Sequence, residues 1–334
     1  MDKEPKQLDL FIPEESQPPF TNRGVTVSIH WLSLTFFTNP AKAMTHFLNE
    51  FLSYGIKDEY DWSEYFHPAG HGARGYEALY FGPEGVRLYA YPKLGKHCHL
   101  EITGKVIDMY GNQRCIDYLT SLFKQEYVSK CKRIDIAFDH VPFTPQDCYD
   151  AWQRGDVIAK CHHDSWDWRE NKEGKTLYIG SRQSERFIRI YDRRGFTRLE
   201  IVFKDKWSEN FARVITEIPS KEWINQCIGY LRDYVNFVSV KPKNIKSVSH
   251  DTLSWWSTFI GDSEKVCLNI DKRNANEDLK IRLENYFKRL LPTLYIIRHG
   301  LAKDINKIID NSDHLLNQKH LKKLEFITDR TQKI

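Results

Sequence analysis

A cluster of arginines surrounds one tyrosine in the middle of the chain. Six arginines and only two acidic residues occur between residues 182 and 198. Arginine suits phosphate because its planar guanidinium offers several N–H donors in a fixed geometry. The hydroxyl of Tyr191 could attack a phosphodiester and hold it covalently. The cluster therefore predicts a nucleic-acid site, with a solvated charged surface as the alternative. The arginines expected to contact DNA are Arg182, Arg186, Arg189, Arg193 and Arg198.

The sequence around Tyr191 alternates apolar and polar residues, which is typical of β-strands. Three strands are expected, at 176–181, 186–192 and 197–204, with a loop at 182–185 and a turn at Arg194-Gly195. In this antiparallel meander Tyr191 lies opposite Arg198, and Arg189 lies opposite Glu200. Tyr178 also lies opposite Arg189 and is the competing candidate for a nucleophile.

Carboxylates occupy the polar faces of three expected strands. Asp135 and Asp139 share one face of the strand at 132–139, although Asp is a poor strand former. We expect Arg133 to point with the apolar residues of that strand. Carboxylate oxygens and an imidazole nitrogen suit a hard divalent cation, which could polarise a scissile phosphate. The sequence therefore predicts a site for Mg²⁺ or Mn²⁺, with ligands drawn from Asp135, Asp139, Glu200, His99 and Glu101.

The elements that must position these residues predict an α+β fold, with antiparallel sheets and helices packed to one side. Further strands are expected at 25–37 and 97–103. Helices are expected at 41–54, 112–127, 144–154, 208–217, 220–238, 251–260, 277–298 and 302–325. We divide the chain into a disordered arm (1–22), a catalytic domain (23–240) and a helical C-terminal region (241–334). The last region is basic, with 18 basic and 12 acidic residues.

Composition excludes several classes of protein. The 334 residues carry 49 basic and 45 acidic side chains, and no apolar run is long enough for a transmembrane helix. The first 15 residues hold five acids, which is unlike a signal peptide, so we expect a cytoplasmic protein without a membrane partner. Seven cysteines without a CxxC pair argue against a disulfide scaffold or a zinc ribbon.

The N-terminal arm contains one apolar motif. The residues Gln7, Leu8, Asp9, Leu10 and Phe11 resemble the pentapeptide by which many bacterial replication proteins bind the sliding clamp. Apolar side chains in a polar, proline-punctuated segment commonly anchor it to a partner. The motif predicts clamp binding, and the alternative is that the run pairs with this protein's own sheet.

Four segments together resemble the replication-initiation factor family, Rep_trans. They are HLEITG (99–104), KRIDIAFD (132–139), TLYIGSRQSERFIRIYDRR (176–194) and RLEIVFK (198–204). Their order and approximate spacing match the family across about residues 25–240. The pair of tryptophans at 255–256, followed by Phe259, also resembles the family's later region. The family includes initiators of rolling-circle plasmids and relaxases of some integrative conjugative elements.

The resemblance implies an enzyme that nicks one DNA strand at an origin and later rejoins it. Its tyrosine lies in a motif like R-x-Y-[DEN]-K, which matches residues 189–193 with Arg193 in place of the usual Lys. The product of nicking would be a 5′-phosphotyrosine, and a divalent metal would assist. Alternatives are a conjugative relaxase and a non-catalytic origin-binding protein.

The implied partners are origin DNA, both duplex and single-stranded, and a helicase. The chain has no P-loop motif, so we expect the helicase to come from the host. A homodimer is one open alternative for the oligomeric state.

Overall fold

The structure, a computed structural model, describes residues 20–22, 24–57, 61–93, 96–124, 129–172, 174–219, 222–239 and 251–267. The chain divides into two units, Met1–Ile270 and Asp271–Ile334. The second unit, with the helices expected at 277–298 and 302–325, lies outside the described residues. So does the clamp-binding motif at 7–11. Across the described ranges, no helix is both long and apolar enough to cross a membrane.

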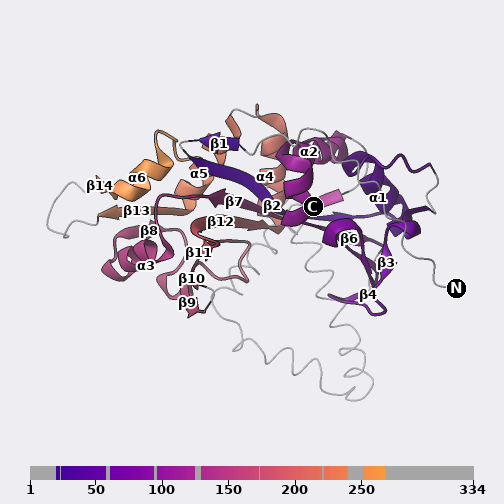
Figure 1. The fold of residues 1–334 in the computed structure, drawn as a ribbon, viewed down its shortest axis with the longest axis horizontal. Coiled ribbons are helices and arrows are strands. Elements are labelled where there is room, and N and C mark those ends of the chain that lie inside the picture. Colours follow the sequence, from indigo (N-terminus) through magenta and orange to yellow (C-terminus); the bar gives the residue numbers. More distant parts are fainter. Residues whose placement is uncertain are drawn as a thin grey trace, which may run out of the picture. The chain divides into compact units, whose positions relative to one another are not determined.

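An eleven-stranded antiparallel sheet forms the centre of the first unit (Figure 1). Its strands follow the order β3-β4-β5-β6-β2-β7-β12-β11-β10-β9, and β1 pairs with β2. Their bounds are β1 Phe20–Asn22, β2 Val25–Phe36, β3 His67–Pro68, β4 Tyr76–Phe81, β5 Arg87–Pro92, β6 Cys98–Thr103, β7 Ser129–Asp139, β9 Asp167–Asn171, β10 Gly174–Ile179, β11 Arg186–Arg193 and β12 Phe196–Lys204. A smaller sheet joins β14 (Asp251–Thr252), β13 (Val235–Ser239) and β8 (Val157–Ala159).

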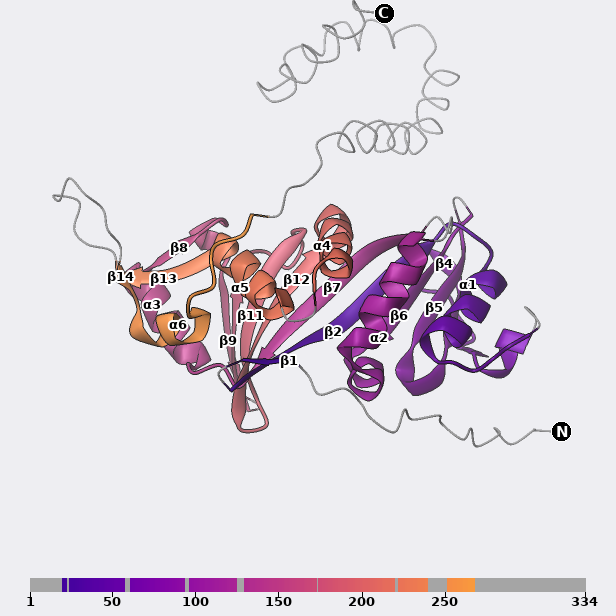
Figure 2. The ribbon, with the colours of Figure 1, turned by 90° about the horizontal axis from the view of Figure 1, so that it is seen from above.

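Helices α2, α4 and α5 pack on one face of the large sheet (Figure 2). The helices are α1 Pro40–His46, continued by a π-helical turn at Phe47–Phe51, α2 Gly104–Lys124, α3 Pro145–Arg154, α4 Asp205–Glu217, α5 Trp223–Tyr234 and α6 Ser254–Ile260. Short 3₁₀ turns lie at Asp61–Glu64, Pro83–Gly85 and His163–Ser165. The core sits between the sheet and these helices, where Phe203 of β12 stacks on Phe211 of α4 at 4.8 Å between ring centroids. The predicted α+β class is confirmed.

Two helix starts follow from local sequence signals. Asn39 caps α1 by accepting the Lys42 N–H, with Pro40 at the first helical position. Thr144 and Asp147 form a reciprocal capping box at the start of α3. Both satisfy backbone N–H groups that would otherwise lack a partner.

A two-residue turn fixes the register of β11 and β12. Arg193 pairs with Phe196, and the residues between them, Arg194 and Gly195, have φ of 44° and 92°. Positive φ at both turn residues matches the right-handed twist of a hairpin. The predicted Arg194-Gly195 turn is therefore confirmed.

A bulge in β2 reverses which face its side chains occupy. Ile29 pairs with Ile136 and Trp31 pairs with Asp135, so that His30 is an extra residue. The buried apolar positions are odd-numbered before the bulge, at 25, 27 and 29, and even-numbered after it, at 32, 34 and 36. The bulge places His30 and Trp31 on the same face, because Trp31 lies in the row of Asp135 and His30 approaches Glu200.

The helix expected at 112–127 is preceded by a further helical segment that begins at Gly104, with a kink at Gly111 between the two. Three other expected elements also differ from the structure. The helix expected at 220–238 ends at Tyr234, and the β-branched and aromatic run that follows forms β13 beside β8. Residues 251 and 252 pair as β14 before α6 begins. Residues 20–22, which we assigned to the arm, pair with β2 as β1. The partner of β13 is distant in sequence, whereas β1 and β14 pair with strands next to them along the chain.

We expect Asn112→Ala to lower the free energy of unfolding by about 2 to 4 kcal/mol. The buried Asn112 side chain accepts the Ile29 N–H at 2.8 Å and donates to the Val27 carbonyl at 3.1 Å, beside the bulge. Its loss leaves two buried backbone groups without a partner. Urea denaturation followed by tryptophan fluorescence measures the change.

The matched control is Asp117→Ala, on the exposed side of the same helix, which should alter stability by no more than about 0.5 kcal/mol. Equal stability of the two variants would contradict the role of Asn112.

Candidate active site on the open face of the sheet

Polar side chains line the sheet face opposite α2, α4 and α5, which we call the open face. Strand pairing aligns them in rows. One row contains Ser28, Ala137, Glu200, Arg189 and Tyr178. The next contains Thr26, Asp139, Arg198, Tyr191 and Thr176. The predicted neighbours of Tyr191 and of Arg189 are confirmed by these pairings.

The hydroxyl of Tyr191 donates a hydrogen bond to Glu200 Oε1 at 2.6 Å. Arg189 Nε binds the other oxygen of the same carboxylate, and Arg198 Nη1 lies 3.7 Å from Oε1. Burial, followed by the Glu200 charge and hydrogen bond, raises the pKa of the Tyr191 hydroxyl. The phenol is therefore protonated at neutral pH and needs a proton acceptor to become a nucleophile. Glu200 Oε1 is placed to accept that proton.

Arginines also engage the two aspartates of β7. Arg133 Nε and Nη2 donate to the two oxygens of Asp135 at 2.8 and 2.6 Å. Arg198 binds both oxygens of Asp139. The prediction that Arg133 points with the apolar residues was wrong, because alternation puts residues 133 and 135 on one face. Since an unpaired buried carboxylate is costly, these arginines explain how the sheet accommodates the two aspartates.

His30 is a site residue that sequence analysis missed. Its Nε2 lies 3.8 Å from Glu200 Oε1, and within the described chain its buried Nδ1 has no hydrogen-bond partner. Burial lowers the pKa of His30, which favours the neutral imidazole. The switch of apolar positions from odd to even numbers in β2 was the available signal, because it marks a bulge next to residue 30.

His99 and Glu101 belong to a second polar cluster, on β6. Glu101 accepts from Arg74 and from the Tyr89 hydroxyl, the latter at 3.0 Å. His99 Nδ1 lies 3.0 Å from the Thr35 hydroxyl. Strands β2 and β7 separate β6 from β12, a distance of roughly 14 Å at the usual strand spacing. One ion cannot contact both Glu101 and Glu200, because metal–oxygen bonds are only about 2.0–2.6 Å long.

The predicted metal ligands do not converge on one point. In the described part of the chain, no three His, Cys, Asp or Glu side chains are placed to hold a metal ion. Asp135 and Asp139 direct both oxygens at arginines, and Glu200 binds Arg189 and Tyr191. An ion would have to displace these donors, so the arrangement does not fit Mg²⁺ or Mn²⁺ as it stands. The metal stays a prediction from the family resemblance.

The predicted DNA-binding arginines fall into different environments. Arg182 is exposed, and its guanidinium lies 5.1 Å from the ring centroid of Tyr178. Arg189 and Arg193 are partly exposed, and Arg198 is buried. Arg186 lies on the helical side, bound to Asp233 at 3.3 Å between the rings of Trp207 and Tyr234. Assigning Arg186 to DNA binding therefore conflicts with the structure, since its guanidinium is enclosed by protein.

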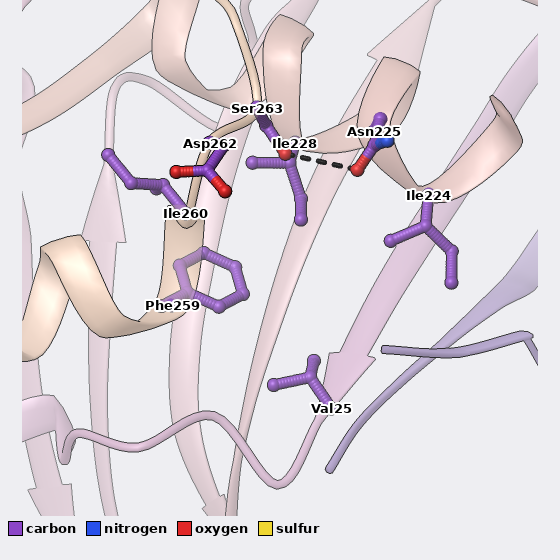
Figure 3. A pocket seen from close by; sticks show the side chains of 8 residues that line it. All are labelled: Val25, Ile224, Asn225, Ile228, Phe259, Ile260, Asp262 and Ser263. Atoms are coloured by element: carbon purple, nitrogen blue, oxygen red, sulfur yellow. Dashed lines mark hydrogen bonds between the residues drawn. The ribbon is translucent and has the colours of Figure 1, made fainter. Parts of the chain in front are cut away.

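A pocket of about 200 Å³ lies on the helical side of the sheet (Figure 3). Apolar side chains such as Ile224, Ile228 and Phe259 line it, and Ser263 hydrogen-bonds to Asn225 at its rim. None of the predicted site residues lines this pocket. The open face therefore remains the candidate active site.

The chain belongs to the replication initiation factor family. The model of that family, Rep_trans, matches residues 129–311, a range that includes β7, β11 and β12 with Asp135, Tyr191 and Glu200. The family resemblance is thus confirmed. No curated protein matches this sequence.

Among solved structures, a rolling-circle initiator has a similar fold. The rolling circle replication initiator protein from Geobacillus stearothermophilus aligns with 74% of this chain and 99% of its own, with a TM-score of 0.55 and 18% sequence identity. The regulatory subunit of aspartate kinase from Thermus thermophilus aligns with 57% of this chain and 95% of its own, at 8% identity. Its TM-score of 0.14 is too low to bear on the fold.

Arg186→Gln should destabilise the fold by about 2 kcal/mol or more, because it removes one partner of a buried ion pair. Arg182→Gln should leave stability unchanged and instead reduce DNA affinity, lowering the salt slope by about 0.7 to 0.9 if one phosphate contact is lost. Urea denaturation and DNA binding at several salt concentrations separate the two effects. If Arg186→Gln instead lowered DNA affinity and left stability unchanged, Arg186 would belong to the DNA interface.

Proposed function

We propose that this chain is a rolling-circle replication initiator that nicks one strand of origin DNA through Tyr191 and later rejoins it. The observation that carries the proposal is the hydrogen bond from Tyr191 to the buried Glu200, with Arg198 opposite Tyr191 and Arg189 opposite Glu200 on the open face. Membership of the replication initiation factor family gives the chemistry its context.

In the proposed nicking step, Tyr191 Oη attacks the phosphorus of one phosphodiester. The Oη–P bond forms while the O–H bond breaks, and the proton passes to Glu200 Oε1. The P–O3′ bond then breaks, and the 3′ oxygen leaves with a proton from solvent. The DNA is left with a free 3′-hydroxyl and a 5′-phosphotyrosine. Attack of a 3′-hydroxyl on that phosphotyrosine reverses these steps and rejoins the strand.

Arginines around Tyr191 suit the charge that develops on the phosphate. Within the described chain, Nη1 of Arg198 and Nη1 of Arg193 are buried nitrogens without a hydrogen-bond partner. Arg189 is bound to Glu200 and lies 3.9 Å from Asp135. Guanidinium groups fixed in place before the reaction stabilise a phosphoryl transition state more effectively than mobile ones.

A conjugative relaxase would use the same tyrosine chemistry, and the genetic element would distinguish it from a plasmid initiator. The host helicase, the sliding clamp and a second copy of the chain remain expected partners that the comparisons do not address. A divalent metal also remains an expectation from the family.

Tyr191→Phe should abolish nicking of supercoiled origin plasmid and leave duplex binding within about twofold, because only a hydroxyl is removed. The assay measures relaxed plasmid and, by mass spectrometry, the mass of a trapped DNA–protein adduct. It is run with Mn²⁺, with Mg²⁺ and with EDTA.

Tyr178→Phe is the matched control, on the same face of the adjacent strand, and it should nick normally. If only Tyr178→Phe lost nicking activity, Tyr178 and not Tyr191 would be the nucleophile. Full nicking in EDTA would remove the metal expectation, and no nicking by the parent protein would favour a non-catalytic origin-binding protein.

Glu200→Gln should slow nicking by about 10² to 10⁴, the usual contribution of a general base. The Glu200 charge raises the pKa of Tyr191, so the neutral Gln lowers that pKa. Residual nicking by the variant should therefore rise with pH as the phenol ionises, more steeply than nicking by the parent protein. Rates are measured at several pH values.

The matched control is Glu217→Gln, at an exposed position of α4, which should retain the parent rate. A Glu200→Gln rate equal to that of the parent across the pH range would contradict proton transfer to Glu200.

A further inference from the structure

The open face continues beyond the residues that the family model matches. Strands β4, β5, β6 and β2 precede residue 129, where the match begins. They belong to the same sheet as Tyr191. A row of paired residues leads from Arg133 through Ser33 and Glu101 to Arg87 and Phe81. The face of the sheet that carries Tyr191 therefore continues across to β4.

Ring side chains in contact with one another lie at the end of this face where β6 begins, and we call them the aromatic end: Phe37, Tyr76 and His97. Phe37 is 45% exposed, which is unusual for phenylalanine. The ring centroids of Phe37 and His97 lie 6.1 Å apart, and those of His97 and Tyr76 lie 5.4 Å apart. Burial and then Lys132 lower the pKa of His97, so its ring is neutral near pH 7.

Positive charge accompanies these rings. Arg74 is 56% exposed and lies over the ring of Tyr89 at 5.1 Å while it binds Glu101. Arg87 shares the row of Phe81, and Arg133 lies over the ring of Trp31 at 5.3 Å, between the aromatic end and Tyr191. Cations along a path with exposed rings match the combination that binds single-stranded nucleic acid, in which bases stack and phosphates pair with cations.

We infer that the aromatic end binds single-stranded DNA by base stacking, on the same strand that Tyr191 cuts. This inference rests on the proposed nicking function and extends it to the part of the chain before residue 129. Four strand spacings separate β11 from β6, or roughly 19 Å across the strands. The row of Tyr191 crosses β2 at Thr26, so Phe37 lies a further ~35 Å along the strand. Single-strand sites span about 4 to 16 nucleotides, so one strand can reach both places.

The test is equilibrium binding of fluorescein-labelled (dT)20 and of a duplex of the same length to the full chain, measured by anisotropy. The double variant Phe37→Ala/His97→Ala should bind (dT)20 at least about fivefold more weakly, the lower end of the cost of losing one stacked base. Duplex binding should change less than twofold. Phe37→Leu, which keeps an apolar side chain and loses the ring, should also weaken (dT)20 binding.

The matched control is Ile158→Ala on β8, an exposed apolar residue (49%) outside the large sheet, which should bind (dT)20 as the parent does. Equal weakening by this control, equal loss of duplex binding, or unchanged (dT)20 binding by the double variant would each overturn the inference. Covalent nicking by the parent protein is scored separately, so that failure of the aromatic end is distinguished from failure of the nicking proposal.

Discussion

The pairing of buried carboxylates with arginines is the constraint on which the open face depends. Glu200 and Asp135 are fully buried in the sheet. The neighbouring strand β11 supplies Arg189 to Glu200, and Arg133 reaches Asp135 from two residues away on the same strand, β7. A carboxylate removed from water without a partner costs several kcal/mol, whereas a two-pronged guanidinium restores its hydrogen bonds. The arginines must therefore lie on strands at registers that reach these carboxylates. That requirement fixes the positions of the side chains around Tyr191.

Much of this arrangement was predictable because alternation and turn chemistry are local. A two-residue turn at Arg194-Gly195 allows only one register between β11 and β12. The residues opposite Tyr191 and Arg189 can therefore be found by counting back from the turn. The same reasoning should have placed Arg133 beside Asp135. Its charge suggested a strand margin, but position on a strand, not polarity, decides the face.

The remainder depended on contacts between distant parts of the chain. The β2 bulge is held by Asn112, more than eighty residues away in sequence, and it alone brings His30 toward Glu200. Alternation along β11 puts Arg186 on the same face as the apolar residues. Its partner Asp233 comes from α5, and the sequence of β11 does not predict which helix packs there. The separation of Glu101 from Glu200 likewise follows from strand order. Strand β2 lies between β6 and β7 in the sheet, although both come much later in the sequence, and this order puts β6 three strands away from β12.

The proposed chemistry depends on the same arginines that balance the charge of Glu200. A DNA phosphate that approaches Tyr191 brings negative charge toward Glu200, and the same arginines must compensate both groups. As Tyr191 Oη bonds to phosphorus, negative charge builds on the phosphoryl oxygens. If the proton passes to Glu200 Oε1 in that step, the carboxylate becomes neutral and its hold on Arg189 weakens. The guanidinium is then free to donate to the phosphate, so that the net charge of the row is unchanged. Transfer to solvent would leave both negative charges in place in a poorly hydrated site, where their repulsion is strongest.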